Sequence, residues 1–231
     1  LRYGVNVQAE VSDKKKMVRL IDWTNPLAND FQIAEEVTIH DASERRPDLV
    51  VYINGIAIAV IELKRSTVSV HEGIRQNIRN QQDGYIPKFF TTIQLLFAGN
   101  DTEGLHYGVI KTPEKFWLRW KEPCGEPCKE SHIKSDQYPN ELDRSVLQFF
   151  EPNRIVEFIH DFIIFDGGAK KAARPNQYFA IKAAQPRICR KENGIIWHSQ
   201  GSGKSLTMIW MAQWIRENVD DARVVIITDR D

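Results

Sequence analysis

The sequence lacks three features that would assign it to a class at once: a cysteine framework, an excess of charge, and a long apolar run. Only three cysteines occur among its 231 residues (Cys124, Cys128 and Cys189), too few for a disulfide scaffold. Cys124 and Cys128 have no matching second pair of ligands, so free thiols are the simpler interpretation and a zinc site the alternative. Lysine plus arginine equals aspartate plus glutamate, so the formal net charge is zero and no overall positive field attracts nucleic acid.

The absence of a signal peptide and of a long uncharged apolar segment makes a cytoplasmic location the default expectation. A hydrophobic content of 42% and a charged content of 27% are ordinary for a globular protein. The length allows one large domain, or one domain with part of another. We interpret both ends as trimmed, because Leu1 stands first and the last residues resemble the end of a strand.

A β-hairpin is the strongest local prediction. Residues 49–53 and 56–63 are β-rich and apolar, and Asn54-Gly55 between them is a typical two-residue hairpin turn. The second segment is apolar on both faces until Glu62, as expected of a buried central strand.

The remaining elements follow from periodicity and capping patterns. Ser69 with Glu72 predicts a capped helix as far as about Gln82. We also expect a helix start after Asn25-Pro26, strands near 37–39, 92–98 and 107–110, a loop over 121–141, helices near 142–150, 153–164 and 176–186, strands over 194–197 and 223–228, and a helix from Lys204 to about Asn218. Gly167-Gly168 with the basic run to Arg174 is interpreted as a linker, which divides the chain into residues 1–166 and 167–231.

The end of the predicted hairpin carries chemistry. Asp48 precedes the first strand, and Glu62 and Lys64 end the second, on one face of it. Two carboxylates can hold Mg²⁺ beside an open coordination position, the Leu63 main-chain carbonyl can add a ligand, and a lysine can stabilise developing negative charge. That combination suits phosphodiester hydrolysis. Glu36, or Glu35, is a further candidate acid for the metal site, with a salt-bridged surface helix end as the alternative.

The register of the hairpin tests this hypothesis. A strict two-residue turn sets Asp48 opposite Ile61 and sends Asp48 and Glu62 to opposite faces. A one-residue bulge, or a wider turn, pairs them instead. We therefore predict a bulge or a wider turn.

A second signature lies downstream, where an apolar segment leads into a glycine loop and then an apolar-periodic helix. The loop residues are Gly201, Ser202, Gly203, Lys204 and Ser205. In a phosphate-binding loop the backbone N–H groups cradle phosphates, the lysine reaches the β and γ phosphates, and the Ser205 hydroxyl binds Mg²⁺. His198 stands where such loops usually have their first glycine.

No second acidic motif follows the glycine loop at the end of a later strand, where an ATPase needs one to hold Mg²⁺ and position water. Asp229 ends a predicted strand without a second acid after it, and Asp166 lies upstream, after an apolar run interpreted as the end of a helix. We therefore expect no ATP turnover by these 231 residues alone.

These motifs together resemble the restriction and motor (R) subunit of type I restriction–modification enzymes. Asp48, Glu62 and Lys64 match that family's PD-(D/E)xK nuclease motif. Residues 200–205 match helicase motif I, and residues 224–230 resemble motif Ia. Residues 174–178 resemble the adenine-reading Q-motif, with Gln177 as the implied reader of the base.

The resemblance implies an α/β fold: a PD-(D/E)xK restriction-endonuclease-like domain, with a mixed sheet flanked by helices, followed by the incomplete start of a RecA-like P-loop domain of helicase superfamily 2. It implies Mg²⁺ and ATP as cofactors, and double-stranded DNA and the specificity and methyltransferase subunits as partners. The family's Gln-x-x-x-Tyr motif is imperfect here, because Asn80 follows Gln76 and the shifted match Gln81 to Tyr85 falls near the helix end.

Two other functions fit the same residues. One is another helicase–nuclease fusion, such as a RecB-like repair enzyme. The other is a degenerate nuclease fold that serves as a DNA-docking or assembly module. Lys14-Lys15-Lys16 is interpreted as a solvated turn, with a phosphate contact as the alternative.

Overall fold

The computed structural model describes residues 1–8, 14–123 and 140–228. Its centre is a six-stranded mixed sheet in the order β10-β9-β8-β7-β6-β3. The strands are β3 (Phe31–Glu35), β6 (Leu49–Ile53), β7 (Ile56–Leu63), β8 (Leu95–Asn100), β9 (Gly104–Gly108) and β10 (Leu118–Arg119). Only β7 and β8 pair in parallel, and every other neighbouring pair is antiparallel. The mixed sheet expected from the sequence is confirmed.

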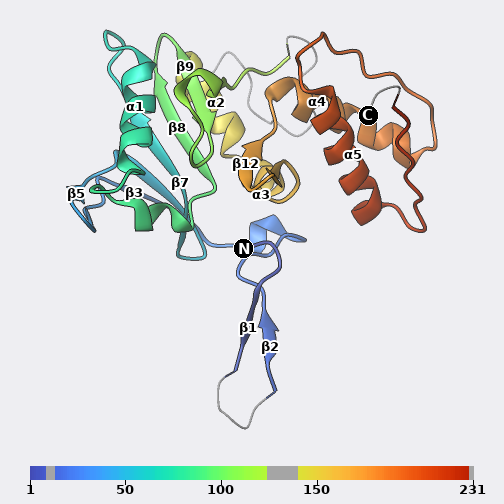
Figure 1. Cartoon of the computed structure of the whole chain (residues 1–231), viewed down its shortest axis with the longest axis horizontal. Coiled ribbons are helices and arrows are strands. Elements are labelled where there is room, and N and C mark those ends of the chain that lie inside the picture. The colour runs from blue at the N-terminus through green and yellow to red at the C-terminus, as the bar shows by residue number, and fades with distance from the viewer. Residues whose placement is uncertain (9–13, 124–139, 229–231) are drawn as a thin grey trace.

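Helices cover both faces of the sheet (Figure 1). α1 (Val70–Asn80) packs on β7 and β8 with the apolar side chains of Val60, Ile74 and Leu96. The opposite face carries the larger core, which α2 (Glu141–Phe149), α3 (Pro152–Asp161) and α4 (Pro175–Cys189) close. The sheet is therefore buried on both faces, which explains why β7 and β8 are almost wholly apolar.

The β6–β7 turn is as the sequence predicts. Asn54 and Gly55 both have positive φ, 52° and 76°, the conformation of a type I′ hairpin turn. The Asn54 amide also donates to the Leu20 carbonyl at 2.9 Å, which fixes the turn against the N-terminal segment.

The segment after Asn25 was predicted as a helix and is not one. It forms only a 3-10 turn, η1 (Pro26–Ala28), before β3. The Asn29 side chain fixes this turn: its Oδ1 accepts from the Asp22 N–H at 2.8 Å, and its Nδ2 donates to the Asp22 carbonyl at 2.9 Å. The chain then forms the edge strand β3, which pairs with β6. Local periodicity cannot predict this pairing, because the two strands are far apart in the sequence. The strand expected near 37–39 is the two-residue β4 (Ile39–His40), which pairs with β5 (Glu44–Arg45).

The expected linker is also different. Residues 163–166, predicted as a helix end, form β11 (Ile163–Asp166), which pairs with β12 (Ala169–Ala172) around a turn at Gly167-Gly168. A short apolar run is compatible with either a helix or a strand, and the pairing decides it. The division at 166/167 stays a prediction, and this hairpin spans it.

Three smaller features complete the described chain. β1 (Val5–Val7) and β2 (Lys16–Val18) form a separate ribbon that projects away from the sheet (Figure 1). η2 (Pro87–Thr91) and η3 (Glu114–Phe116) are short 3-10 turns. α5 (Lys204–Asn218) follows the glycine loop and lies beside α4.

Candidate functional site

A bulge in the β6–β7 hairpin decides which side chains meet at its open end. The register shifts next to Tyr52 and leaves Ile58 as the extra residue on β7. The Ile58 carbonyl accepts from the N–H of Gln94 at 2.7 Å. Continuing the register past the shift sets Asp48 opposite Glu62, and directly opposed side chains share a face. The predicted bulge is confirmed, so both carboxylates lie on the α1 side of the sheet.

Lys64 joins the two carboxylates. Its Nζ lies 3.8 Å from Asp48 Oδ2 and 3.8 Å from Glu62 Oε2. The same Nζ donates to the Leu63 carbonyl at 3.2 Å, so that carbonyl faces the lysine too. Asp48 Oδ2 accepts from the Leu63 N–H at 2.7 Å, which fixes the aspartate against the end of β7. The structure thus brings together all four groups that the sequence assigned to this site.

Glu62 is unusual because it is a fully buried carboxylate, 0% exposed, at the end of an apolar strand. Neither of its oxygens has a hydrogen-bond partner among the described residues. The pKa of Glu62 is raised from 4.5 to about 8: burial is the largest cause, the Asp48 carboxyl adds to the rise, and Lys64 opposes it. A buried polar group without a partner is costly and calls for one.

The donor set fits a hard divalent cation. It offers carboxylate oxygens from Asp48 and Glu62 and the Leu63 carbonyl, which are the ligand types that Mg²⁺ prefers. The oxygens of Glu62 that lack a partner are the observation that favours a cation here. Because a ligating carboxylate must be deprotonated, cation binding would displace the proton that burial holds on Glu62.

Gly73 on α1 was not identified from the sequence, yet it shapes this site. A Cβ at Gly73 would lie 3.3 Å from the Glu62 carbonyl and 3.1 Å from the Ala98 Cβ. Asn77, one turn later, donates to the Phe97 carbonyl at 2.9 Å. The helix therefore lies directly against β7 and β8, and this closeness buries Glu62. A glycine inside a helical pattern is the signal from which Gly73 could have been identified.

Two further candidates have other contacts. Glu36 is exposed and forms an ion pair with Arg46 at 2.6 Å, as expected of a salt-bridged surface residue, although it follows β3 and not a helix. Gln81 donates to the Asn77 carbonyl at 2.9 Å and accepts from the Lys111 N–H at 2.7 Å, so its amide fixes the end of α1. Gln76 lies one turn after Gly73, on the side of α1 that approaches Glu62.

The glycine loop opens α5 as predicted. Gly203 is the N-cap, with φ 85°, and Lys204 is the first helical residue. Lys204 Nζ donates to the carbonyls of His198 and Ser199, at 3.3 and 3.1 Å, and so closes the loop on itself. The first N–H groups of a fifteen-residue helix thus face the loop, which is the arrangement that attracts anions.

The start of α4 fastens this loop. The Gln177 amide accepts from the Arg174 N–H and donates to the Gly203 carbonyl, both at 2.8 Å. Arg174 also donates to the Gly201 carbonyl at 3.2 Å. A Cβ at Gly203 would lie 2.5 Å from the Gln177 side chain, so only glycine fits. The role of Arg174 was not predicted, and the role of Gln177 as a reader of the base stays a prediction.

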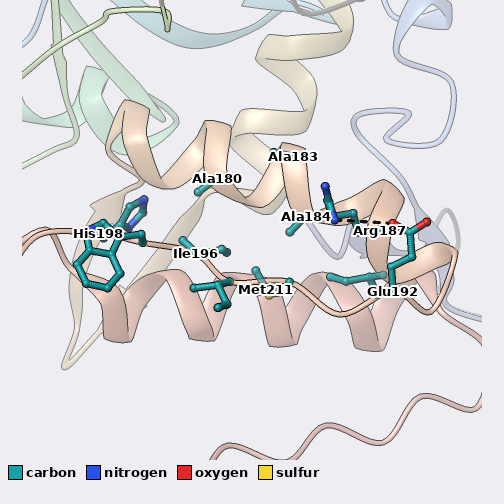
Figure 2. A pocket seen from close by; sticks show the side chains of 12 residues that line it. Ala180, Ala183, Ala184, Arg187, Glu192, Ile196, His198 and Met211 are labelled. Carbon is teal, nitrogen blue, oxygen red and sulfur yellow. Dashed lines mark ion pairs between the residues drawn. The ribbon is translucent and has the colours of Figure 1, made fainter.

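The structure assigns no strand to residues 194–197 or 223–228, which were predicted as strands. Ile195 is 91% exposed and Ile227 is 89% exposed. Residues 194–198 line a hollow of about 510 Å³ together with alanines of α4 and Met211 of α5. Figure 2 shows Ala180, Ile196 and Met211 around it. A strand forms only when it pairs in a sheet, and none of the pairings among the described residues includes these segments.

Other groups of possible metal ligands are less suited. His160, Asp161 and Glu217 lie within ligand distance of one another, but Arg2 already donates to both oxygens of Glu217, at 2.6 and 2.8 Å. Cys124, Cys128 and Asp229 lie outside the described residues, so the zinc alternative is untested. Cys189 is an exposed free thiol.

No helix in the described ranges has both the length and the apolar character needed to span a bilayer.

The fold is that of an α/β protein that carries two candidate sites. A mixed sheet carries a buried acid pair with a lysine, and a glycine loop opens a long helix farther along the chain. Residues 1–115 match the family model described as the type I restriction enzyme R protein N terminus. Residues 176–231 match the SWI2/SNF2 ATPase model.

Two curated relatives agree with this. A putative type I restriction enzyme endonuclease subunit of Methanocaldococcus jannaschii is 29% identical over 98% of the chain and 24% of its own length. A type I restriction enzyme endonuclease subunit of Staphylococcus saprophyticus is 28% identical over 87% of the chain and 21% of its own length. The chain belongs to the type I restriction enzyme R-protein (HsdR) family, of which it carries the N-terminal part. It spans less than a quarter of the length of these relatives.

Proposed function

We propose that this chain is the N-terminal part of the subunit that cuts and translocates double-stranded DNA in a type I restriction–modification complex. Asp48, Glu62 and Lys64 form its PD-(D/E)xK nuclease site. The observation that carries the proposal is the convergence of both carboxylates on one lysine ammonium, at 3.8 Å each, from a bulged hairpin.

Each residue of the site has a separate task. Asp48 and Glu62, with the Leu63 carbonyl, would hold Mg²⁺, which when bound neutralises phosphate charge and activates water. Lys64 supplies a fixed positive charge where the pentavalent phosphate builds up negative charge. Glu62 becomes a ligand by giving up its proton, and its burial keeps bulk water away from one side of the site.

The glycine loop is the ATP site of the motor in this proposal. The loop N–H groups and Lys204 bind the phosphates and Ser205 binds the Mg²⁺ of the nucleotide. Gln177, whose amide donates to the Gly203 carbonyl, is assigned as the reader of the base. Among the described residues after α5, Asp220 and Asp221 closely follow the helix and no strand ends in an acid pair, so ATP turnover is assigned to the full-length subunit. The specificity and methyltransferase subunits select the DNA.

The test uses the full-length subunit assembled with its partners on circular DNA. The Asp48→Ala variant is expected to lose cleavage while ATP hydrolysis and translocation continue, because the two sites do separate chemistry. The Lys204→Ala variant is expected to lose ATP hydrolysis. Asp101→Ala, which removes an exposed acid in the β8–β9 turn, is the matched control and should cut normally.

Normal cleavage by the Asp48→Ala complex would overturn the nuclease assignment and favour the docking-module alternative. Cleavage by a complex without its specificity subunit would favour a repair-type helicase–nuclease instead.

A further inference from the structure

The β1–β2 ribbon concentrates the positive charge that the chain as a whole lacks. Residues 1–20 contain five basic and two acidic residues, although the net charge of the chain is zero. The basic residues are Arg2, Lys14, Lys15, Lys16 and Arg19. Within the described part of this stretch, residues 1–8 and 14–20, no acidic residue occurs.

The ribbon is exposed on both faces. All six residues of β1 and β2 are exposed, as are the remaining residues of 14–19. Figure 1 shows the two strands projecting from the N-terminal end of the molecule, clear of the sheet and of the helices. A two-stranded ribbon in water has no face to bury and is only marginally stable alone. Its exposure therefore leaves it available to a partner.

We propose that this ribbon binds the backbone of duplex DNA as a contact separate from the nuclease site. A two-stranded ribbon has the width that the major groove admits. Lys16 begins β2, and Lys14 and Lys15 directly precede it, so three exposed ammonium groups follow one another at one end of the ribbon and can reach the phosphates that line a groove. Phosphate contact needs no base-reading side chains, and the apolar Val5, Val7 and Val18 offer none.

The position of the ribbon makes it a distinct contact. At the β6–β7 turn, where β7 begins, the Asn54 side-chain amide donates to the carbonyl of Leu20, two residues after the end of β2. Glu62 and Lys64 lie at the other end of β7, whose eight residues span roughly 25 Å. A duplex held by the ribbon would therefore be held one strand length from the point of cutting.

The experiment measures binding of the 231-residue chain to a 30-base-pair duplex by fluorescence anisotropy, in EDTA and without ATP, over a series of salt concentrations. Each phosphate contact contributes about −0.9 to the slope of log K against log salt concentration. The triple variant Lys14→Gln, Lys15→Gln, Lys16→Gln is expected to reduce that slope by about 2–3. The effect should be the same for duplexes of unrelated sequence.

The control variant carries the same charge change elsewhere: Lys88→Gln, Lys121→Gln and Lys191→Gln, all exposed. It should keep the wild-type slope. As a measurement without mutation, lysine acetylation read by mass spectrometry should show Lys14, Lys15 and Lys16 protected by DNA. Both variants are compared by thermal melting first.

An unchanged slope in the ribbon variant, acetylation that DNA does not reduce, or no measurable DNA binding by the wild-type chain would each overturn the proposal. Loss of binding to a protein subunit, with DNA binding intact, would assign the ribbon to complex assembly instead and would overturn it as well. Because the assay needs neither metal nor cleavage, it is independent of the nuclease assignment, and Asp48→Ala should bind DNA like the wild type.

Discussion

Replacing Glu62 by glutamine should make the metal-free protein more stable at alkaline pH than the wild type. The pKa of Glu62 in the folded chain is raised from 4.5 to about 8, chiefly by burial. The folded state therefore holds a proton that the unfolded chain releases. Its stabilising contribution is complete below about pH 4.5 and is lost as the pH rises through about 8. Glutamine is neutral throughout and has no such loss.

The magnitude follows from the shift. One pKa unit corresponds to about 1.4 kcal/mol. Between pH 5 and pH 9 the wild type should lose about 4 kcal/mol relative to Glu62→Gln, as an order of magnitude. For a chain of this length that corresponds to roughly 10 °C in the melting temperature. Other titrating groups are common to both proteins and cancel in the difference.

The assay is urea unfolding in EDTA at pH 5, 7 and 9. The control is Glu103→Gln. Backbone and side-chain hydrogen bonds from Val70 and Asn100 hold the pKa of Glu103 below its usual value, so its contribution is lost as the pH falls, not as it rises. A difference between wild type and Glu62→Gln that stays flat within about 1 kcal/mol from pH 5 to pH 9 would refute the buried-carboxylate argument.

A second arm of the same experiment tests the cation. At pH 8, Mn²⁺ or Mg²⁺ should restore stability to the wild type by about 3 kcal/mol at a hundredfold excess over the dissociation constant. Glu62→Gln should gain little. Equal gains in both proteins would show that the cation binds somewhere else.

Two other substitutions test the packing around the sites. Gly203→Ala should destabilise the chain by about 1–3 kcal/mol and weaken nucleotide binding, because the new Cβ would meet the Gln177 amide at 2.5 Å. Gly201→Ala, where nothing lies within 4 Å, should show only the cost of its positive φ; melting curves and nucleotide titrations compare the two. Tyr107→Phe should cost about 1–3 kcal/mol by urea unfolding, because the buried Ala173 carbonyl loses the hydroxyl that donates to it at 2.6 Å. A neutral Tyr107→Phe would show that water replaces the hydroxyl.

The sequence predicted the hairpin because Asn54-Gly55 favours a type I′ turn. It indicated a site at the end of β7 because a carboxylate that ends an otherwise apolar strand needs a partner. The bulge followed from requiring two carboxylates to share a face, so a chemical hypothesis fixed a backbone detail. The burial of Glu62 was less accessible, since it depends on α1 lying against β7, which Gly73 permits.

The wrong predictions share a physical cause. Residues 163–166 and 31–35 are short apolar or mixed segments whose state is set by the strand they pair with, and pairing is a long-range contact. The opposite error occurred at 194–197, where β-rich composition predicted a strand but no partner strand lies beside it. In each case the local pattern was compatible with strand, helix or loop, and tertiary contacts decided.

The linker expected at Gly167-Gly168 shows most directly what composition cannot reveal, while the boundary at residue 166 stays a prediction. Glycines and a basic run indicate a linker, yet the residues that follow are part of the same core. Tyr178 and Phe179 of α4 are buried with Trp120 of the sheet, with ring centroids 5.7 and 5.5 Å apart. The side-chain amide of Gln177, the neighbour of Tyr178, donates to the Gly203 carbonyl of the glycine loop. One helix therefore bears on both the aromatic core and the loop, and a shift of Gly203 relative to the sheet must either break that amide contact or move a packed aromatic side chain.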